Sequence, residues 1–273
     1  PRLVYGYITG YGPEGADRDR AGYDIGAYWS RSGLAHTLVP PGDMPPSLRS
    51  GMGDHQTGMT LVAGVMAKLL ERERTGRGGL VSTSLLRTGM YSIAWDFGIQ
   101  LRFDRRESTK SRDRNRAPLI NCYRAGDDRV FWLICLEADR HWPQVLAAID
   151  RLDLADDPRF VDAKARVTHS QDLIAEFDRV FATRPLGEWA ERFDQQDVWW
   201  APVQSIVDVI GDPQAQSGFV GMTPRGGDEP FRAVATPVDF DGHEVDWEEL
   251  TFRRRSYLDE EIRALSEFEC RVY

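Results

Sequence analysis

An apolar helix preceded by a glycine-flanked aspartate is the feature that most constrains this chain. Residues 51–58 read Gly-Met-Gly-Asp-His-Gln-Thr-Gly, and apolar side chains follow at helical spacing over residues 59–70. The pattern ends near Gly76, which can supply the left-handed residue that closes a helix. We therefore predict that Asp54 lies in a turn just before a buried helix.

A carboxylate at this position has two compatible roles. It can be the N-cap of the helix, a place where Asp is favoured. It can also act as a nucleophile on an acyl group, because the helix N-terminus stabilises negative charge and offers unpaired N–H donors. The flanking Gly53 and Gly58 would let a substrate approach the backbone closely. The motif alone leaves both roles of Asp54 open.

Runs of β-forming residues on either side of the helix indicate an α/β fold. Residues 3–9 are predicted to form a buried strand, residues 80–85 a second strand and residues 86–101 a helix. Residues 10–15 match the glycine spacing of a dinucleotide-binding loop, but no helix opens inside the motif, so we interpret it as a flexible loop. Because a domain rarely starts inside a core strand, we expect the chain to be the later part of a longer protein.

A change of composition after residue 101 indicates a second unit. Residues 102–118 are rich in Arg, and we interpret them as a solvated linker, with a local basic patch for phosphates as the alternative. A β-hairpin is predicted over residues 121–134. Further elements are predicted over residues 142–149, 171–182, 185–195, 201–212, 231–238 and 259–268.

Charge and composition exclude several classes of protein. The formal net charge of −9 argues against a nucleic-acid binder, which needs a basic face. Cys122, Cys135 and Cys270 suggest neither a metal site nor a disulfide framework, which fits a reducing cytoplasm. No apolar run has the length of a membrane span, and the five histidines lack metal-ligand spacing. His55, beside Asp54, is interpreted as a turn residue that makes a local hydrogen bond.

Several short motifs acquire meaning through their order along the chain. They are Gly10-x-Gly12, Arg20-Ala21-Gly22-Tyr23-Asp24, Gly53-Asp54-x-x-Thr57-Gly58, Asp156-Asp157-Pro158-Arg159-Phe160 and Ala201-Pro202-Val203-Gln204. This ordered set resembles the family III coenzyme A transferases, also called the CaiB/BaiF family. The family contains formyl-CoA and carnitine-CoA transferases and also α-methylacyl-CoA racemase.

The resemblance implies an α/β architecture with two domains. Residues 1–101 would be the C-terminal part of a large Rossmann-like domain whose N-terminal half is missing. Residues 102–118 would be a linker, residues 119–222 a smaller α+β domain, and residues 223–273 a second linker with the C-terminal return to the large domain. The resemblance also implies an interlocked homodimer and a cytoplasmic enzyme, without nucleic-acid or membrane partners.

The resemblance also implies a chemistry for Asp54. Coenzyme A would move from an acyl-CoA donor to a carboxylic acid acceptor through an aspartyl-CoA thioester on Asp54, with no metal and no bound cofactor. Tyr23 would orient a carboxylate, and backbone N–H groups near Gly53 and Gly58 would stabilise the oxyanions. Gly12, Gly53, His55 and Gly58 are the candidate substrate- or CoA-binding residues.

Tyr23 also bears on the choice between reaction types. The racemases of the family carry a histidine at this position, which works with the aspartate as an acid/base pair. A tyrosine hydroxyl releases its proton far less readily than an imidazolium does, so Tyr23 favours a transferase. Proton transfer of the racemase or epimerase type remains an alternative, as does a non-catalytic fragment that only binds CoA or dimerises.

Overall fold

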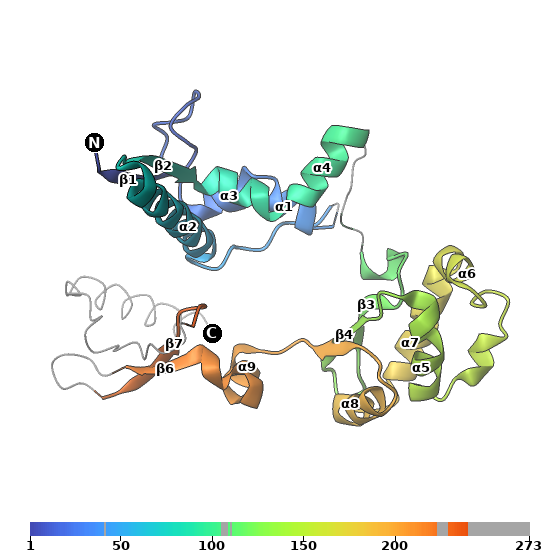
Figure 1. The fold of residues 1–273 in the computed structure, drawn as a ribbon. Helices are drawn as coiled ribbons and strands as arrows, with labels where there is room; N and C mark the ends of the chain where they lie inside the picture. Colours follow the sequence, from blue (N-terminus) through green and yellow to red (C-terminus); the bar gives the residue numbers. More distant parts are fainter. Residues whose placement is uncertain (41, 105–108, 110, 223–228, 240–273) are drawn as a thin grey trace. The chain divides into compact units, whose positions relative to one another are not determined.

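The computed structural model describes residues 1–40, 42–104, 109, 111–222 and 229–239 (Figure 1). The chain divides into two compact units, Pro1–Ala201 and Pro202–Tyr273. Within the first unit, residues 1–104 and residues 111–201 each build a hydrophobic core of their own. The fold combines helices and strands, as the sequence predicts.

A β-α-β crossover forms the centre of residues 1–104. Strands β1 (Val4–Thr9) and β2 (Gly79–Ser84) pair in parallel, with Val4 opposite Gly79 and Thr9 opposite Ser84. Helix α2 (Met52–Thr75) connects them, as parallel strands require. A Cβ atom on Gly64 would lie 2.7 Å from Cγ1 of Val81, so the glycine lets α2 pack closely on the strands. Both predicted strands are confirmed.

Four shorter helical segments complete this group. They are η1 (Ile25–Ser30), α1 (Leu34–Leu38), α3 (Leu85–Ser92) and α4 (Ala94–Phe103). The prediction of one helix over residues 86–101 is wrong, because Ile93 leaves the helical conformation with φ −119° and ψ 35°. Just before it, the hydroxyl of Ser92 donates to the carbonyl of Thr88 at 3.0 Å, a back-bond that bends helices.

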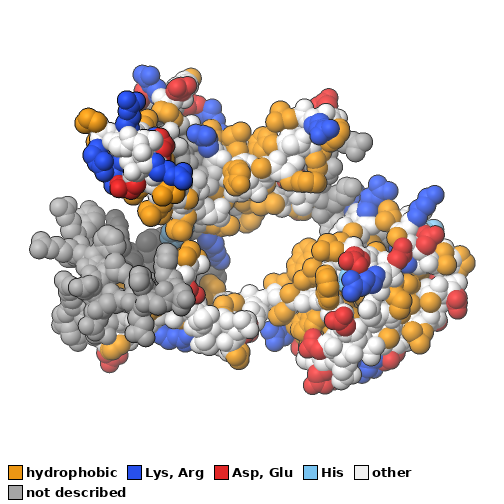
Figure 2. Space-filling model, viewed as in Figure 1, with side chains coloured by type: hydrophobic (Ala, Val, Ile, Leu, Met, Phe, Trp, Pro, Cys, Tyr) orange, Lys and Arg blue, Asp and Glu red, His pale blue; other side chains and the backbone are white. Residues whose placement is uncertain are grey.

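Strand β1 and helix α2 are less buried than the sequence predicts. In β1, Tyr5 and Ile8 are 56% and 44% exposed. Helix α2 buries only Gly53 and Thr57, so the prediction of a buried helix is wrong for the chain as described. One face of α2 packs on the strands, whereas no element described within residues 1–104 covers its other apolar side chains, which lie at the surface of this group (Figure 2). These exposed side chains are Met59, Val62, Met66 and Leu70.

Residues 111–201 form a three-stranded sheet covered by helices. The strand order is β3-β4-β5, with β3 (Ile120–Arg124) antiparallel to β4 (Val130–Ile134) and β5 at Trp200–Pro202. The helices are α5 (Ala138–Ala148), α6 (Ala163–Thr168), α7 (Ser170–Phe181) and α8 (Leu186–Gln195), with 3₁₀ turns η2 (Arg112–Arg114) and η3 (Leu152–Ala155). The predicted hairpin and the helices predicted over residues 142–149, 171–182 and 185–195 are confirmed, with small differences at their ends.

Aromatic side chains fill the core of this group. Phe181 is fully buried, with its ring centroid 5.0 Å from those of Tyr123 and Phe131 and 5.4 Å from that of Trp189. The indole of Trp189 also donates to the carbonyl of Phe181 at 3.0 Å. Helices α7 and α8 are therefore joined to the sheet through one interlocked cluster.

The second unit is described over residues 202–222 and 229–239. It contains α9 (Ile206–Gly211), the 3₁₀ turn η4 (Pro213–Gly218) and the antiparallel pair β6 (Phe219–Met222) and β7 (Phe231–Val234). The elements predicted over residues 201–212 and 231–238 are thus present, the latter as a shorter strand. The helix predicted over residues 259–268 lies outside the described residues, and the predicted domain boundaries remain predictions.

Candidate active site

Glycines bring three segments of residues 1–104 into contact. A Cβ atom on Gly10, in the loop after β1, would lie 2.9 Å from Cα of Gly22. A Cβ atom on Gly53, in the first turn of α2, would lie 2.6 Å from Cγ of Tyr28 and 2.8 Å from Cβ of Asp24. No side chain fits at either place, so the glycine loop, the segment before η1 and the start of α2 lie side by side.

Asp54 lies in the first turn of α2 rather than before the helix. The helix begins at Met52, and its N-cap is Gly51, which has φ 77° and makes no side-chain cap. Both the predicted turn position of Asp54 and its interpretation as the N-cap are therefore wrong, because the left-handed glycine starts the helix earlier. The Asp54 carboxylate is exposed, and within the described residues it makes no hydrogen bond or ion pair. It is an accessible anion at the positive end of a helix.

Two backbone donors beside the carboxylate are unused. The N–H of Met52 donates to Arg49 at 3.1 Å and that of His55 to Gly51 at 2.8 Å. Between them, the N–H groups of Gly53 and Asp54 find no acceptor in the part of the chain that the structure describes. They can therefore donate to an oxyanion at the helix end.

Gly58 differs from Gly53 in its surroundings. It lies in the second turn of α2, where a backbone N–H is bonded to the carbonyl four residues earlier. Gly58 is thus not one of the free donors. A Cβ atom at this position would meet no heavy atom within 4 Å, which leaves open space beside the helix.

Tyr23 and Gly12 lie on the other two segments. The carbonyl of Tyr23 accepts from the N–H groups of Gly26 and Ala27 at 3.0 and 2.9 Å, whereas its side chain is 80% exposed. Gly12 has φ 106°, a conformation that favours glycine, and its N–H donates to the hydroxyl of Thr9 at 2.9 Å. Both backbones are therefore held in place, and the Tyr23 phenol is left accessible.

His55 lies in α2 and not in the predicted turn. Its imidazole lies back over the N-cap, with Cε1 3.3 Å from the place of a Cβ atom on Gly51. The local hydrogen bond of this residue runs from its backbone N–H to the carbonyl of Gly51. The imidazole itself has no hydrogen-bond partner among the described residues and is exposed to a ligand.

A polar cluster that no sequence motif indicated holds the start of α2 in place, with Tyr28 buried and Gln56 and Ser92 exposed. The phenol of Tyr28, only 2% exposed, donates to Oε1 of Gln56 at 2.8 Å. The hydroxyl of Ser92 lies 3.2 Å from the Tyr28 oxygen and 3.3 Å from Oε1 of Gln56. These bonds join α2 to η1 and α3 next to Asp54. In the sequence, the one indication of this cluster is general: a tyrosine in a core needs a hydrogen-bond partner for its hydroxyl.

An ion pair holds the glycine loop against the end of η1. Asp17 pairs with Arg31, whose guanidinium carbon lies 5.3 Å from the centroid of the Tyr11 ring. The hydrogen bond from Arg31 lowers the pKa of the Asp17 carboxyl. The loop that carries Gly12 is therefore positioned by charge as well as by the Gly10–Gly22 contact.

The described residues form neither a metal site nor a membrane span. There, no three His, Cys, Asp or Glu side chains gather closely enough to hold a metal ion. No described helix combines the length and the apolar character needed to cross a bilayer.

Known proteins resemble this chain in sequence and in structure. Residues 1–249 match the family described as CoA-transferase family III. The (R)-2-hydroxy-4-methylpentanoate CoA-transferase of Clostridioides difficile is 29% identical over 220 residues, which cover 79% of this chain and 53% of the relative. The cinnamoyl-CoA:phenyllactate CoA-transferase of Clostridium sporogenes is 31% identical over 225 residues, with the same two shares. This chain therefore spans about half the length of these relatives.

The structural likeness supports the same fold. A CAIB/BAIF family protein from Brucella suis superimposes with a TM-score of 0.74 at 24% identity, over 89% of this chain and 62% of that one. Rv3272 from Mycobacterium tuberculosis gives a TM-score of 0.73 at 22% identity, over 87% of this chain and 63% of that one.

Proposed function

We propose that this chain, which belongs to CoA-transferase family III, carries the nucleophile of an enzyme that moves coenzyme A from an acyl-CoA donor to a carboxylic acid. One observation carries the proposal: the Asp54 carboxylate is exposed in the first turn of α2, beside two N–H groups without a described acceptor. An anion that is accessible and unpaired can attack an acyl carbon, whereas a paired one is held back.

The first half of the reaction transfers coenzyme A to Asp54. The carboxylate attacks the thioester carbonyl of the donor, the C–S bond breaks, and a mixed anhydride and a CoA thiolate form. The thiolate then attacks the Asp54 carbonyl and displaces the donor's carboxylate. Asp54 is now an aspartyl-CoA thioester, and no electron has been gained or lost.

The second half repeats these steps with the acceptor. The acceptor carboxylate attacks the aspartyl-CoA carbonyl, which gives a new mixed anhydride and again a CoA thiolate. The thiolate attacks the acyl carbon of the acceptor, and Asp54 is regenerated as a carboxylate. Coenzyme A is therefore a substrate throughout, and the proposed cycle uses neither a metal nor a bound cofactor.

The surrounding residues have separate parts in this proposal. The N–H groups of Gly53 and Asp54 stabilise the tetrahedral oxyanions, a contribution that is large when donors are fixed in advance. The Tyr23 phenol orients a substrate carboxylate. Gly12, His55 and the open side of Gly58 contact the substrate or coenzyme A. An interlocked homodimer of cytoplasmic chains, expected from the family resemblance, belongs to the same proposal.

The experiment uses the whole protein that the native gene encodes. It is incubated with a panel of acyl-CoA donors that includes 4-methylpentanoyl-, cinnamoyl- and succinyl-CoA, quenched, and digested for peptide mass spectrometry. We expect CoA or acyl mass on the peptide that contains Asp54, and its loss together with turnover in Asp54→Asn. Asp96→Asn is the matched control, because Asp96 also lies in the first turn of a helix, α4.

Two results would contradict the proposal. Turnover that persists in Asp54→Asn would remove the nucleophile from the mechanism. Exchange of the donor's α-proton with deuterium from solvent, without any adduct from any donor, would indicate the racemase type of chemistry instead.

A further inference from the structure

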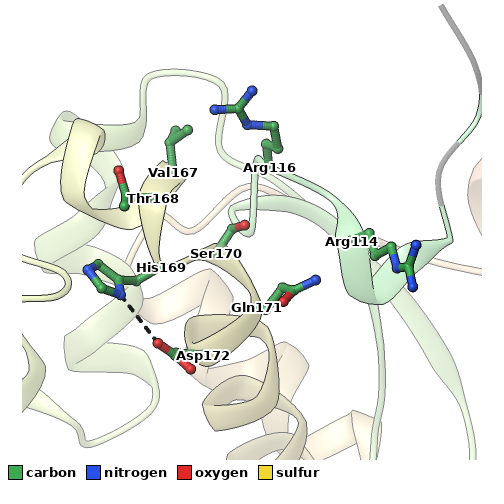
Figure 3. A pocket seen from close by; sticks show the side chains of 8 residues that line it. All are labelled: Arg114, Arg116, Val167, Thr168, His169, Ser170, Gln171 and Asp172. Carbon is green, nitrogen blue, oxygen red and sulfur yellow. Dashed lines mark hydrogen bonds and ion pairs between the residues drawn. The ribbon is translucent and has the colours of Figure 1, made fainter.

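A basic pocket lies at the N-terminal end of α7, within residues 111–201. Its volume is about 370 Å³, and its polar lining includes Arg114, Arg116, His169, Ser170, Gln171 and Asp172 (Figure 3). None of these residues takes part in the chemistry proposed for Asp54. The pocket is large enough for a small ligand, so its donors and charges decide what it binds.

The first turn of α7 offers three unused backbone donors. The N–H of His169 donates to Ala165 at 2.9 Å, and that of Leu173 donates to His169 at 3.1 Å. The N–H groups of the three residues in between, 170–172, find no acceptor within the described chain, and no side chain caps this helix end. These N–H groups lie at the junction where α7 follows the last turn of α6 through His169, and residues of both helices line the pocket.

Ser170, a largely buried residue, contributes a hydroxyl to the wall of the pocket. Ser170 is 6% exposed, and its hydroxyl has no hydrogen-bond partner among the described residues. Figure 3 shows this hydroxyl pointing into the space between Arg116 and Gln171. A hydroxyl that has no protein partner and faces a pocket is free to donate to, or accept from, a ligand there.

Two arginines add charge to the same pocket. The guanidinium groups of Arg114 and Arg116 form no ion pair and no hydrogen bond with any described residue. Arg112, two positions earlier, instead binds Asp178 with two nitrogens and donates to the carbonyl of Cys122 at 2.7 Å. The prediction of a solvated linker is therefore wrong for Arg112, which anchors the segment and leaves the next two arginines beside the pocket.

The negative groups near the pocket do not cancel this charge. Asp172 lies 3.4 Å from Nδ1 of His169, with which it interacts. Asp113 has its pKa lowered by a hydrogen bond from Ser111, with Arg114 as a further, smaller cause. Asp113 therefore stays ionised beside Arg114, but it does not line the pocket. Among the lining residues, two guanidinium groups and the first turn of α7 stand against one carboxylate, that of Asp172. The charges that line the pocket therefore favour the binding of an anion.

We propose that this pocket binds the phosphate group of a small ligand. The arginine forks, the Ser170 hydroxyl and the three N–H groups together supply more donors than the two oxygens of a carboxylate accept, whereas a phosphate offers three or four oxygens. Inorganic phosphate and the phosphomonoester of a nucleotide share this chemistry. This proposal depends only on the residues of the pocket, so it does not require the chemistry proposed for Asp54.

The test titrates the 273-residue chain with inorganic phosphate in a calorimeter. We expect saturable binding that weakens at least about tenfold in the double variant Arg114→Gln/Arg116→Gln and several-fold in Ser170→Ala, as the loss of charge-assisted hydrogen bonds implies. Arg179→Gln is the control for the loss of a positive charge away from the pocket, since Arg179 lies in the last turn of α7 and pairs with Glu176. Competition with adenosine 3′,5′-bisphosphate then distinguishes the sources: displacement of phosphate identifies an organic phosphate, and its absence identifies the free ion.

A variant that binds phosphate more tightly would show that the pocket residues act on the ligand and not only on the fold. Asp172→Asn removes the carboxylate that lines the pocket, so phosphate should bind more tightly, which a damaged fold would not produce. Circular dichroism shows that each variant is folded. The proposal is overturned if the folded chain does not bind phosphate, or if the double variant binds it as tightly as the original chain does.

Discussion

The two parts of the first unit use their apolar residues differently. Helix α2, with 24 residues, buries only Gly53 and Thr57, whereas α7, with 12 residues, buries five side chains. The larger hydrophobic cluster lies wholly in residues 111–201, and the smaller one in residues 1–104 contains few buried side chains. The candidate catalytic carboxylate thus belongs to the part with the thinner core. Most of the burial that stabilises the chain therefore lies in a different part from Asp54.

The largest expected effect comes from the aromatic core. Phe181→Ala should lower the free energy of unfolding by about 3–5 kcal/mol, because it removes a fully buried ring that contacts Tyr123, Phe131 and Trp189. Leu70→Ala in α2 is the control from the other part: its side chain is 64% exposed, so the change should stay within about 0.5 kcal/mol. Urea unfolding measures both, and equal losses would contradict the contrast between the two parts.

A pair of glycines in α2 gives the next largest effect. Gly53→Ala would place a Cβ atom 2.6 Å from Cγ of Tyr28, so α2 must move and stability should fall by about 1–3 kcal/mol. Gly58→Ala meets nothing within 4 Å and should stabilise the helix by about 0.5–1 kcal/mol. The same substitution at two positions of one helix should thus change the stability of the chain in opposite directions.

The pair also separates packing from chemistry. Thermal unfolding of the two variants measures the stability difference, and CoA transfer measured on the protein as its native gene encodes it reports on the site. We expect Gly53→Ala to lose most of its activity, because the carboxylate at the next position moves with the helix. Undiminished transfer in a Gly53→Ala variant would show that this contact does not position Asp54.

Regular patterns allowed much of the fold to be predicted from the sequence. Strands β1 and β2, the hairpin β3–β4 and helices α7 and α8 follow from periodicity within each segment. The start of α2 and the break at Ile93 were missed, because they depend on the backbone conformations of single residues. The exposure of α2 was missed since a periodic pattern shows which face is apolar and not whether anything covers it.

The candidate site was predictable residue by residue but not as an arrangement. Asp54, Tyr23 and Gly12 were chosen from motifs, and the structure places their segments side by side. Their roles stay predictions. The Tyr28–Gln56 bond joins residues 28 positions apart, and no local pattern indicates such a pairing. The pocket on α7 was missed for the same reason, since Arg116 and Ser170 line one pocket only after the chain has folded.

The smallest expected effect is a dependence of stability on pH, through the phenol of Tyr123 in the larger core. Burial raises the pKa of the Tyr123 phenol, which donates to the carbonyl of Pro118 at 2.7 Å. The folded chain therefore keeps this proton at pH values where the unfolded chain, with an ordinary pKa near 10.0, has lost it. The stability that this group contributes is present below pH 10 and is lost as the pH rises above it, by about 1.4 kcal/mol per pH unit.

Tyr123→Phe tests this dependence on pH. The variant should be about 1 kcal/mol less stable at pH 8, because one hydrogen bond is lost, and the difference should shrink or reverse by pH 11. Phe177→Leu is the control: it loosens the packing against Tyr123 without changing a titratable group, so its deficit should be similar at both pH values. Urea unfolding at pH 8, 10 and 11 makes the comparison. A constant gap between the original chain and Tyr123→Phe would mean that Tyr123 ionises alike in both states, and that the core of residues 111–201 admits water to its centre.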